Sequence, residues 1–125
     1  VVNDKAKAVL VSNTLVKNGG GAAFLRQSQS DVSGNVVGLN RVGFLVAASS
    51  RAATSYNALY NTDGDYVRVG NPNQPAPELK AQSDLTVDPN FVDPAKDDFR
   101  LRPDSPLTKV GSFPYLGALP PLNFQ

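Results

Sequence analysis

The sequence contains no cysteine, histidine, methionine or tryptophan. The lack of cysteine excludes disulfides and thiol chemistry, and the lack of both cysteine and histidine excludes imidazole acid–base catalysis and zinc sites built from these residues. Any catalytic group would therefore be a carboxylate, a lysine, an arginine or a tyrosine. The lack of cysteine does not identify the cellular compartment, because a chain without disulfides suits a reducing cytosol and a bacterial surface alike.

Strong charge of one sign and long apolar runs are also missing. The 12 Lys and Arg residues balance 11 Asp and Glu residues, so no broad positive field is available to hold nucleic acid. No window reaches the roughly 18 apolar residues that a membrane span needs, and the N-terminus has no signal-peptide pattern. The 125 residues suit a single domain. A chain that begins at Val1 is expected of a processed product or of a segment of a longer polypeptide.

Three segments of the chain align at a constant 22-residue offset, starting at Ser12, Gly34 and Tyr56. Short alternating apolar runs broken by Gly, Asn and Asp indicate β-strands joined by tight turns. A repeat of this length with about two or three strands per unit predicts a parallel β-solenoid of about three to four coils. The aligned columns are Asn13, Asn35 and Asn57; Leu15, Val37 and Leu59; Asn18, Asn40 and Thr62; Ala23, Leu45 and Val67; and Leu25, Ala47 and Val69.

The column of Asn13, Asn35 and Asn57 predicts a ladder of stacked amides, because asparagine tolerates turn backbone and its amides can hydrogen-bond along the stacking axis. The alternative is a row of amides that holds a ligand.

These asparagine-led repeats resemble the right-handed parallel β-helix of pectin-lyase-like proteins, and residues 85–121 resemble the C-terminal end of many bacterial secreted β-helix proteins. The resemblance implies an all-β fold, an extracellular, bacterial-surface or periplasmic location and a polysaccharide-related role. Within one domain, 1–125, we expect regular coils over 1–70, an exposed proline-rich loop over 71–84, and the last coil and tail over 85–125. The tail elements that carry the resemblance are Asp88, Pro89, Phe91, Val92 and Asp93; Asp98, Phe99 and Leu101; Ser105 and Pro106; and Gly117 and Ala118.

Alternation along the strands predicts an outer face that carries aromatic side chains. We expect Leu15, Val37 and Leu59 to point inward, as do the columns of Ala23 and Leu25 on the next strand. The columns that then lie outside on that strand are Ala22, Phe44 and Tyr66, and Phe24, Val46 and Arg68. We expect the C-terminal segment to cover this face with Phe91, Phe99 or Tyr115; the alternative is a face that stacks on sugar rings. The candidate ligand-binding residues are Phe44, Tyr60, Tyr66 and Arg68.

Candidate catalytic groups are Lys17 and Arg41, which could remove a proton in a lyase, and Asp63 and Asp65, which could contribute to a carboxylate pair. Arg41 and Asp63 share a register position, so we expect them to form a surface ion pair. We otherwise interpret these residues as solvated charges.

The stretch NTDGD at residues 61–65 spaces Asn61, Asp63 and Asp65 as calcium loops do. An EF-hand loop starting at Asn61 would need glycine and glutamate where Tyr66 and Pro72 stand. We therefore expect a turn and no cofactor, with an irregular calcium site as the alternative.

The favoured function is a non-catalytic C-terminal β-helix segment that completes or caps a larger secreted, carbohydrate-associated protein. The alternatives are a polysaccharide lyase, epimerase or glycoside hydrolase, and a saccharide-binding surface module. Residues 1–11 contain no obvious cap, so preceding coils or another subunit are expected at the N-terminal edge, and polysaccharide is the further candidate partner.

Overall fold

The computed structural model describes residues 1–123, and within them the fold is all-β. The helical elements in these residues are two short 3-10 turns, η1 (Pro77–Leu79) and η2 (Pro94–Lys96). The parallel arrangement of the first nine strands and the antiparallel arrangement of the later ones divide the chain into a stack and a tail.

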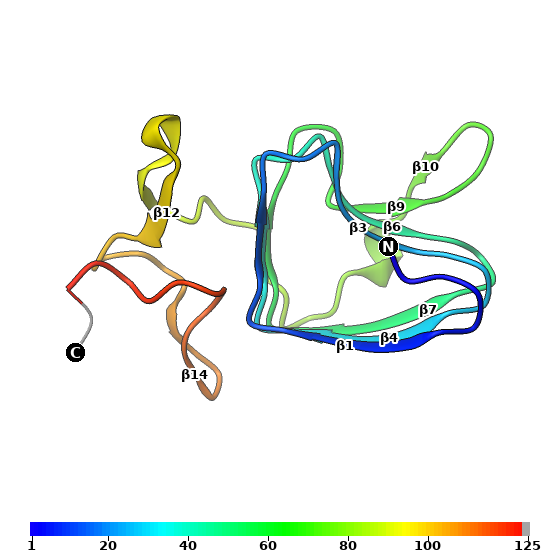
Figure 1. Ribbon diagram of the computed structural model, residues 1–125, viewed down its shortest axis with the longest axis horizontal. Coiled ribbons are helices and arrows are strands. Elements are labelled where there is room, and N and C mark those ends of the chain that lie inside the picture. The colour runs from blue at the N-terminus through cyan, green and yellow to red at the C-terminus, as the bar shows by residue number, and fades with distance from the viewer. Residues whose placement is uncertain (124–125) are drawn as a thin grey trace.

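Each repeat unit of the stack contributes one strand to each of three parallel sheets, β1-β4-β7, β2-β5-β8 and β3-β6-β9. Figure 1 looks along the stack, so that the units superpose in a three-sided outline. The sheet register confirms the predicted offset, since Leu15 pairs with Val37 and Val37 with Leu59. The units comprise β1 (Lys7–Val11), β2 (Thr14–Val16) and β3 (Gly20–Phe24); β4 (Gln29–Ser33), β5 (Val36–Gly38) and β6 (Val42–Val46); and β7 (Arg51–Ser55), β8 (Ala58–Tyr60) and β9 (Tyr66–Arg68).

The main hydrophobic core lies between the three sheets. Val37 and Leu59 point into it with 0% exposure, as alternation predicts. On the third sheet the predicted faces are wrong, because Phe24, Phe44 and Tyr66 are buried in the same core. The phenyl rings of Phe24 and Phe44 lie 5.9 Å apart, and those of Phe44 and Tyr66 lie 5.4 Å apart.

The corner between the second and third strand of a unit explains this error. Lys17 and Leu39 occupy equivalent corner positions with φ of 56° and 58°. A left-handed residue redirects the chain, so alternation counted on one strand does not carry through to the next.

A second left-handed corner precedes each residue of the first asparagine column. Ser12, Gly34 and Tyr56 adopt φ of 60°, 68° and 53° there. Ser12 and Tyr56 show that this φ does not by itself require glycine, but a Cβ on Gly34 would lie 2.4 Å from the ring of Phe113. The corner thus fixes both the backbone turn and the approach of the tail.

Residues 71–84 close the C-terminal end of the stack, where an exposed loop was predicted. The strand β10 (Gln74–Pro75) pairs antiparallel with β9, and the amide of Ala76 donates to the carbonyl of Tyr66 over 2.9 Å. After it, η1 brings Leu79 against the main core. The prolines are exposed as expected, but Ala76 and Asp84 are buried, so this segment covers the last unit.

The tail forms two antiparallel hairpins, β11 (Phe91–Asp93) with β12 (Asp98–Leu101) and β13 (Thr108–Val110) with β14 (Phe113–Tyr115). A last coil was expected here, but the parallel pairing is limited to a bridge between Ala58 and Leu85. Residues 124–125 of the predicted tail lie outside the described part of the chain. Figure 1 shows both hairpins beside the stack.

The tail packs on the outer face of the sheet β2-β5-β8, whereas it was expected to cover the aromatic columns of the third sheet. Val36 and Ala58 point outward from this sheet into a second buried cluster. Gly117 also donates its amide to the carbonyl of Gly34 over 2.8 Å. The tail residues buried in the cluster are Phe91, Leu101, Leu107 and Leu116.

Candidate functional site

The first asparagine column forms a hydrogen-bonded ladder along the stack, which confirms that prediction. Oδ1 of Asn35 accepts from the backbone amide of Asn13 over 2.8 Å and from its Nδ2 over 3.0 Å. Oδ1 of Asn57 accepts from the same two groups of Asn35 over 3.1 and 2.9 Å. The last step goes to Oδ1 of Asp84, which accepts from the amide and Nδ2 of Asn57 over 2.9 and 3.2 Å.

A second ladder runs along the neighbouring corner through Asn18, Asn40, Asn61 and Asp65. The amide of Asn18 donates to Oδ1 of Asn40 over 2.8 Å, and Asn40 donates its amide and Nδ2 to Oδ1 of Asn61 over 3.2 and 3.0 Å. Asn61 does the same to Oδ1 of Asp65 over 3.1 and 2.9 Å. The sequence alignment placed Thr62 in this column, but the step from Asn40 is 21 residues long and ends at Asn61.

Both ladders have the same direction. Between units, the asparagine of the earlier unit donates and Oδ1 of the later asparagine accepts, and Asn57 and Asn61 donate to the terminal carboxylates. An ionised carboxylate accepts hydrogen bonds and donates none, so Asp84 and Asp65 end the ladders at the C-terminal side. At the opposite side, no residue of the described chain donates to Oδ1 of Asn13 or Asn18.

The terminal carboxylate of the first ladder is 2% exposed and has further donors. Its Oδ2 accepts from the hydroxyl of Tyr66 over 2.5 Å and from the amide of Ala81 over 3.0 Å. Burial, and then the hydrogen bond to Asp84, raise the pKa of Tyr66 well above its ordinary value. Asp84 therefore joins the ladder, the last strand and the closing segment through one side chain.

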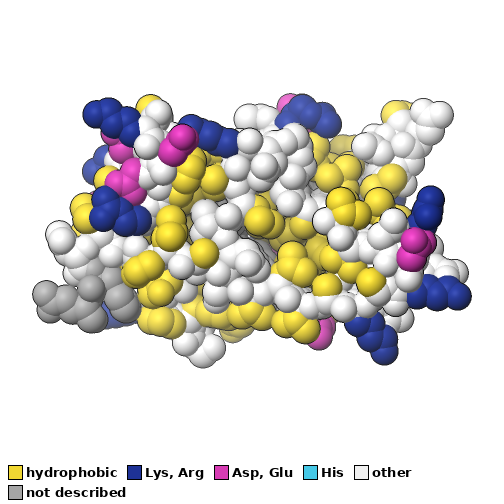
Figure 2. All heavy atoms as spheres, in the orientation of Figure 1, with side chains coloured by type: hydrophobic (Ala, Val, Ile, Leu, Met, Phe, Trp, Pro, Cys, Tyr) yellow, Lys and Arg dark blue, Asp and Glu magenta, His cyan; other side chains and the backbone are white. Residues whose placement is uncertain are grey.

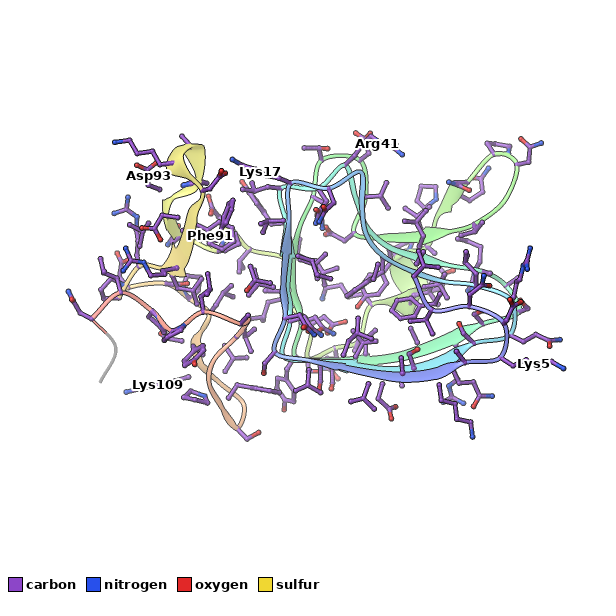
Figure 3. The ribbon with its side chains drawn as sticks, viewed as in Figure 1. Lys5, Lys17, Arg41, Phe91, Asp93 and Lys109 are labelled. Atoms are coloured by element: carbon purple, nitrogen blue, oxygen red, sulfur yellow. The ribbon has the colours of Figure 1, made fainter. Side chains whose placement is uncertain are left out.

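The candidate catalytic cations have carboxylate partners. Nζ of Lys17 lies 2.7 Å from Oδ1 of Asp97 and 2.7 Å from the carbonyl oxygen of Pro94. Figure 3 shows Lys17 reaching from a corner of the stack toward the hairpin that carries Phe91 and Asp93. Arg41 pairs with Asp63 at 3.4 Å, which confirms the predicted surface pair.

The candidate ligand-binding residues do not share an outer face. Phe44 and Tyr66 are 0% and 4% exposed, so their assignment to an exposed face is wrong. Tyr60 is exposed, and Arg68 is half-buried and donates Nη1 to the carbonyl of Ala47 over 3.3 Å. The aromatic surface anticipated from the sequence is thus part of the core.

The candidate calcium residues have other hydrogen-bonding roles. Asn61 and Asp65 belong to the second ladder, and Asp63 pairs with Arg41. Within residues 1–123, no group of three or more Asp and Glu side chains is placed to hold a metal ion. In the same range, no helix has the length and apolar character to cross a membrane.

A groove on the outer face of the sheet β1-β4-β7 has no counterpart among the predicted sites. Its volume is about 460 Å³, and Lys7, Gln29 and Arg51 line it in one register column, with Asp31 in the next. No ion pair in the described chain includes Lys7, Asp31 or Arg51. Positions 7, 29 and 51 are also related by the 22-residue offset, but they lie outside the three aligned segments.

No protein-family model matches the chain, and neither a curated protein nor a solved structure matches it.

Proposed function

We propose that the chain is a non-catalytic segment that completes the C-terminal end of a right-handed parallel β-helix in a larger secreted, carbohydrate-associated protein. The observation that carries the proposal is the end of both ladders at carboxylates, Asp84 and Asp65. A repeating stack can add a further unit only where its last groups can still pair. These two acceptors are already occupied, and they offer no donor to another unit.

The closing segment supports the same proposal. Leu79 covers the last unit of the core, and the carbonyl of Leu85 accepts from the amide of Leu59 over 2.8 Å. Backbone groups of β8 and β9 that would otherwise form an open sheet edge are paired with Leu85 and with β10. Such coverage opposes edge-to-edge association along these two sheets.

A catalytic role receives less support. A base for proton removal in a polysaccharide lyase or epimerase must reach the substrate in a suitable protonation state, whereas Lys17 contacts Asp97 and Arg41 contacts Asp63. Of the carboxylates considered for a hydrolase, Asp65 accepts two hydrogen bonds from Asn61. These contacts favour structural roles.

Hydrogen exchange on the intact chain tests the closed end without disrupting it. We expect the amides of Asn57 and Leu59, which donate to Asp84 and Leu85, to be among the slowest to exchange. Rapid exchange at both positions, with end-to-end oligomers in light scattering, would overturn the proposal. Incubation with uronate polymers and calcium should release no unsaturated products, and their release would contradict a non-catalytic role.

A second candidate function, saccharide binding, is favoured by the groove of Lys7, Gln29, Asp31 and Arg51. Exposed donors and acceptors one strand apart can bond successive hydroxyl and carboxylate groups of an acidic oligosaccharide, with the Arg51 fork on a carboxylate. Calorimetric titration with an oligouronate tests this role. We expect Arg51→Ala to abolish any heat of binding and Lys109→Ala, in the tail, to leave it unchanged; equal heats for both variants would exclude the groove.

A further inference from the structure

We infer that the N-terminal end of the stack is a docking edge for one more coil of the same repeat design, which leads into Val2 and carries two asparagines that continue the ladders. This inference rests on the proposed function, because it identifies what the closed stack is attached to.

The first residues already occupy the register of such a coil. Val2 forms a parallel bridge with Phe24, its amide donates to the carbonyl of Ala23 over 2.8 Å, and its own carbonyl accepts from Leu25 over 2.8 Å. Asp4 pairs with Arg26 across the same 22-residue offset. The chain therefore enters along the third sheet one unit before β3, while β1 and β2 have no such neighbour among residues 1–123.

The apolar interior is open at this end. Leu10 and Leu15 are partly buried, whereas the residues that follow them in register, Val32 and Val37, are 1% and 0% exposed. Ala22 stands in the same relation to Phe44, which is 0% exposed. Figure 2, which has the orientation of Figure 1, shows hydrophobic side chains gathered over the middle of the stack. An occupant must bury this surface with apolar side chains of its own.

The ladders define the polar chemistry of the occupant. Oδ1 of Asn13 and Oδ1 of Asn18 are acceptors. In the later asparagines of both ladders, Oδ1 accepts from the backbone amide of the asparagine one unit earlier. Nδ2 of that earlier asparagine donates as well, except in the step from Asn18 to Asn40. The occupant therefore presents two asparagines separated by four residues, as in the pairs Asn13 and Asn18 or Asn35 and Asn40. Their register positions lie one full repeat before Asn13 and Asn18.

A second copy of the chain does not supply these groups. Its C-terminal end presents Asp84 and Asp65, which are acceptors, and η1 covers the core there. Two N-terminal ends placed together would set the Oδ1 atoms of Asn13 and Asn18 against the same acceptors. Ladder direction thus favours a coil that runs parallel to β1 and continues directly into this chain.

The test adds this coil to the full chain. A copy of residues 23–44 joined before Val1 places the equivalents of Asn35 and Asn40 one full repeat ahead of Asn13 and Asn18. We expect the β1 and β2 amides to exchange at least about tenfold more slowly than in the unextended chain, because each ladder step adds net hydrogen bonds. The matched control carries Ala at both asparagine positions of the added coil and should protect these amides less.

Every outcome decides a part of the inference. Equal protection by the two extensions would overturn the asparagine requirement, and no protection by either would overturn the docking edge. If the edge of the unextended chain becomes protected as concentration rises, a second copy is the occupant and the inference is wrong. Slow exchange at Asn57 and Leu59 reports separately on the proposed function.

If the extended chain does not fold, a free peptide of residues 23–44 can be titrated against the full chain and followed by NMR. We expect it to shift the β1 and β2 amide signals, and no shift at saturating concentration would count against docking.

Discussion

The hydroxyl group of Tyr66 donates a hydrogen bond to Oδ2 of Asp84 over 2.5 Å, and both side chains are buried at the C-terminal end of the stack. Tyr66 belongs to the last parallel strand, and Asp84 belongs to the segment that closes the stack. Their contact fixes the closing segment against the third unit. It also places a phenol where ionisation would put a second negative charge beside a carboxylate.

We expect Tyr66 to remain neutral in the folded chain at a pH at which an unfolded tyrosine is ionised. Burial and the bond to Asp84 raise its folded pKa above the unfolded value of about 10. Its contribution to stability is therefore fully present below about pH 10 and is lost as the pH rises from there toward the folded pKa, by up to about 1.4 kcal/mol per pH unit. Tyrosinate absorbance should show a component that appears only on unfolding. Tyr66→Phe should remove this component, and its persistence in that variant would contradict the assignment.

Replacing Asp84 by alanine should destabilise the chain strongly. The substitution leaves the buried donors of Asn57 and Tyr66 without their acceptor, and each unsatisfied group costs about 1–3 kcal/mol. We expect the free energy of unfolding in urea to fall by roughly 2–5 kcal/mol. Asp104→Ala, at an exposed position, is the control and should change it by less than about 0.5 kcal/mol. Similar losses for the two variants would show that Asp84 has no special role in the ladder.

The first ladder should depend more on its middle than on its first member. Asn35 is 0% exposed, donates Nδ2 to the carbonyl of Leu10 and to Asn57, and accepts from Asn13. Asn35→Ala should lower the free energy of unfolding by about 2–4 kcal/mol, and Asn13→Ala, at the open end, by about 1 kcal/mol or less. Urea unfolding of both variants measures the difference. Equal effects would mean that the ladder adds nothing beyond local turn geometry.

Gly34→Ala should be destabilising, whereas Gly19→Ala should be close to neutral. Gly34 has a positive φ of 68°, and a Cβ there would meet the ring of Phe113 at 2.4 Å. Strain in the left-handed region and displacement of the tail should together cost about 2–4 kcal/mol. Nothing lies within 4 Å of a Cβ on Gly19. Thermal unfolding of the two variants tests this contrast, and an unchanged melting temperature for Gly34→Ala would show that the tail does not pack at this corner.

The parallel register could be predicted from the sequence because it repeats at a fixed offset. The pairings of Leu15 with Val37 and of Asn13 with Asn35 follow directly from the spacing. The burial of Phe44 could not be predicted from alternation, because it depends on how the corner residue Leu39 turns the chain. Side-chain direction after a left-handed corner is a three-dimensional property, which a count along the strand does not contain.

The role of residues 71–84 in closing the stack could not be predicted for a related reason. Residues 71–84 have the proline content of an exposed loop, and most of them are exposed. Their role depends on Leu79 and Asp84, whose partners lie on strands far earlier in the chain. The candidate residues Asn61 and Asp65 likewise have metal-ligand chemistry, but they are used in the second ladder.

The constant step between the first two units limits how the length of this chain can change. Removing or duplicating one whole repeat within them would bring the same kinds of strand side chain back into register, because the parallel strands of each unit pair with those of the neighbouring units. A block of any other size would place Asn13 or Asn18 against a residue that cannot complete its ladder. Insertions and deletions in this part of the protein are therefore expected to be tolerated in whole multiples of the repeat, as discrete increments of length.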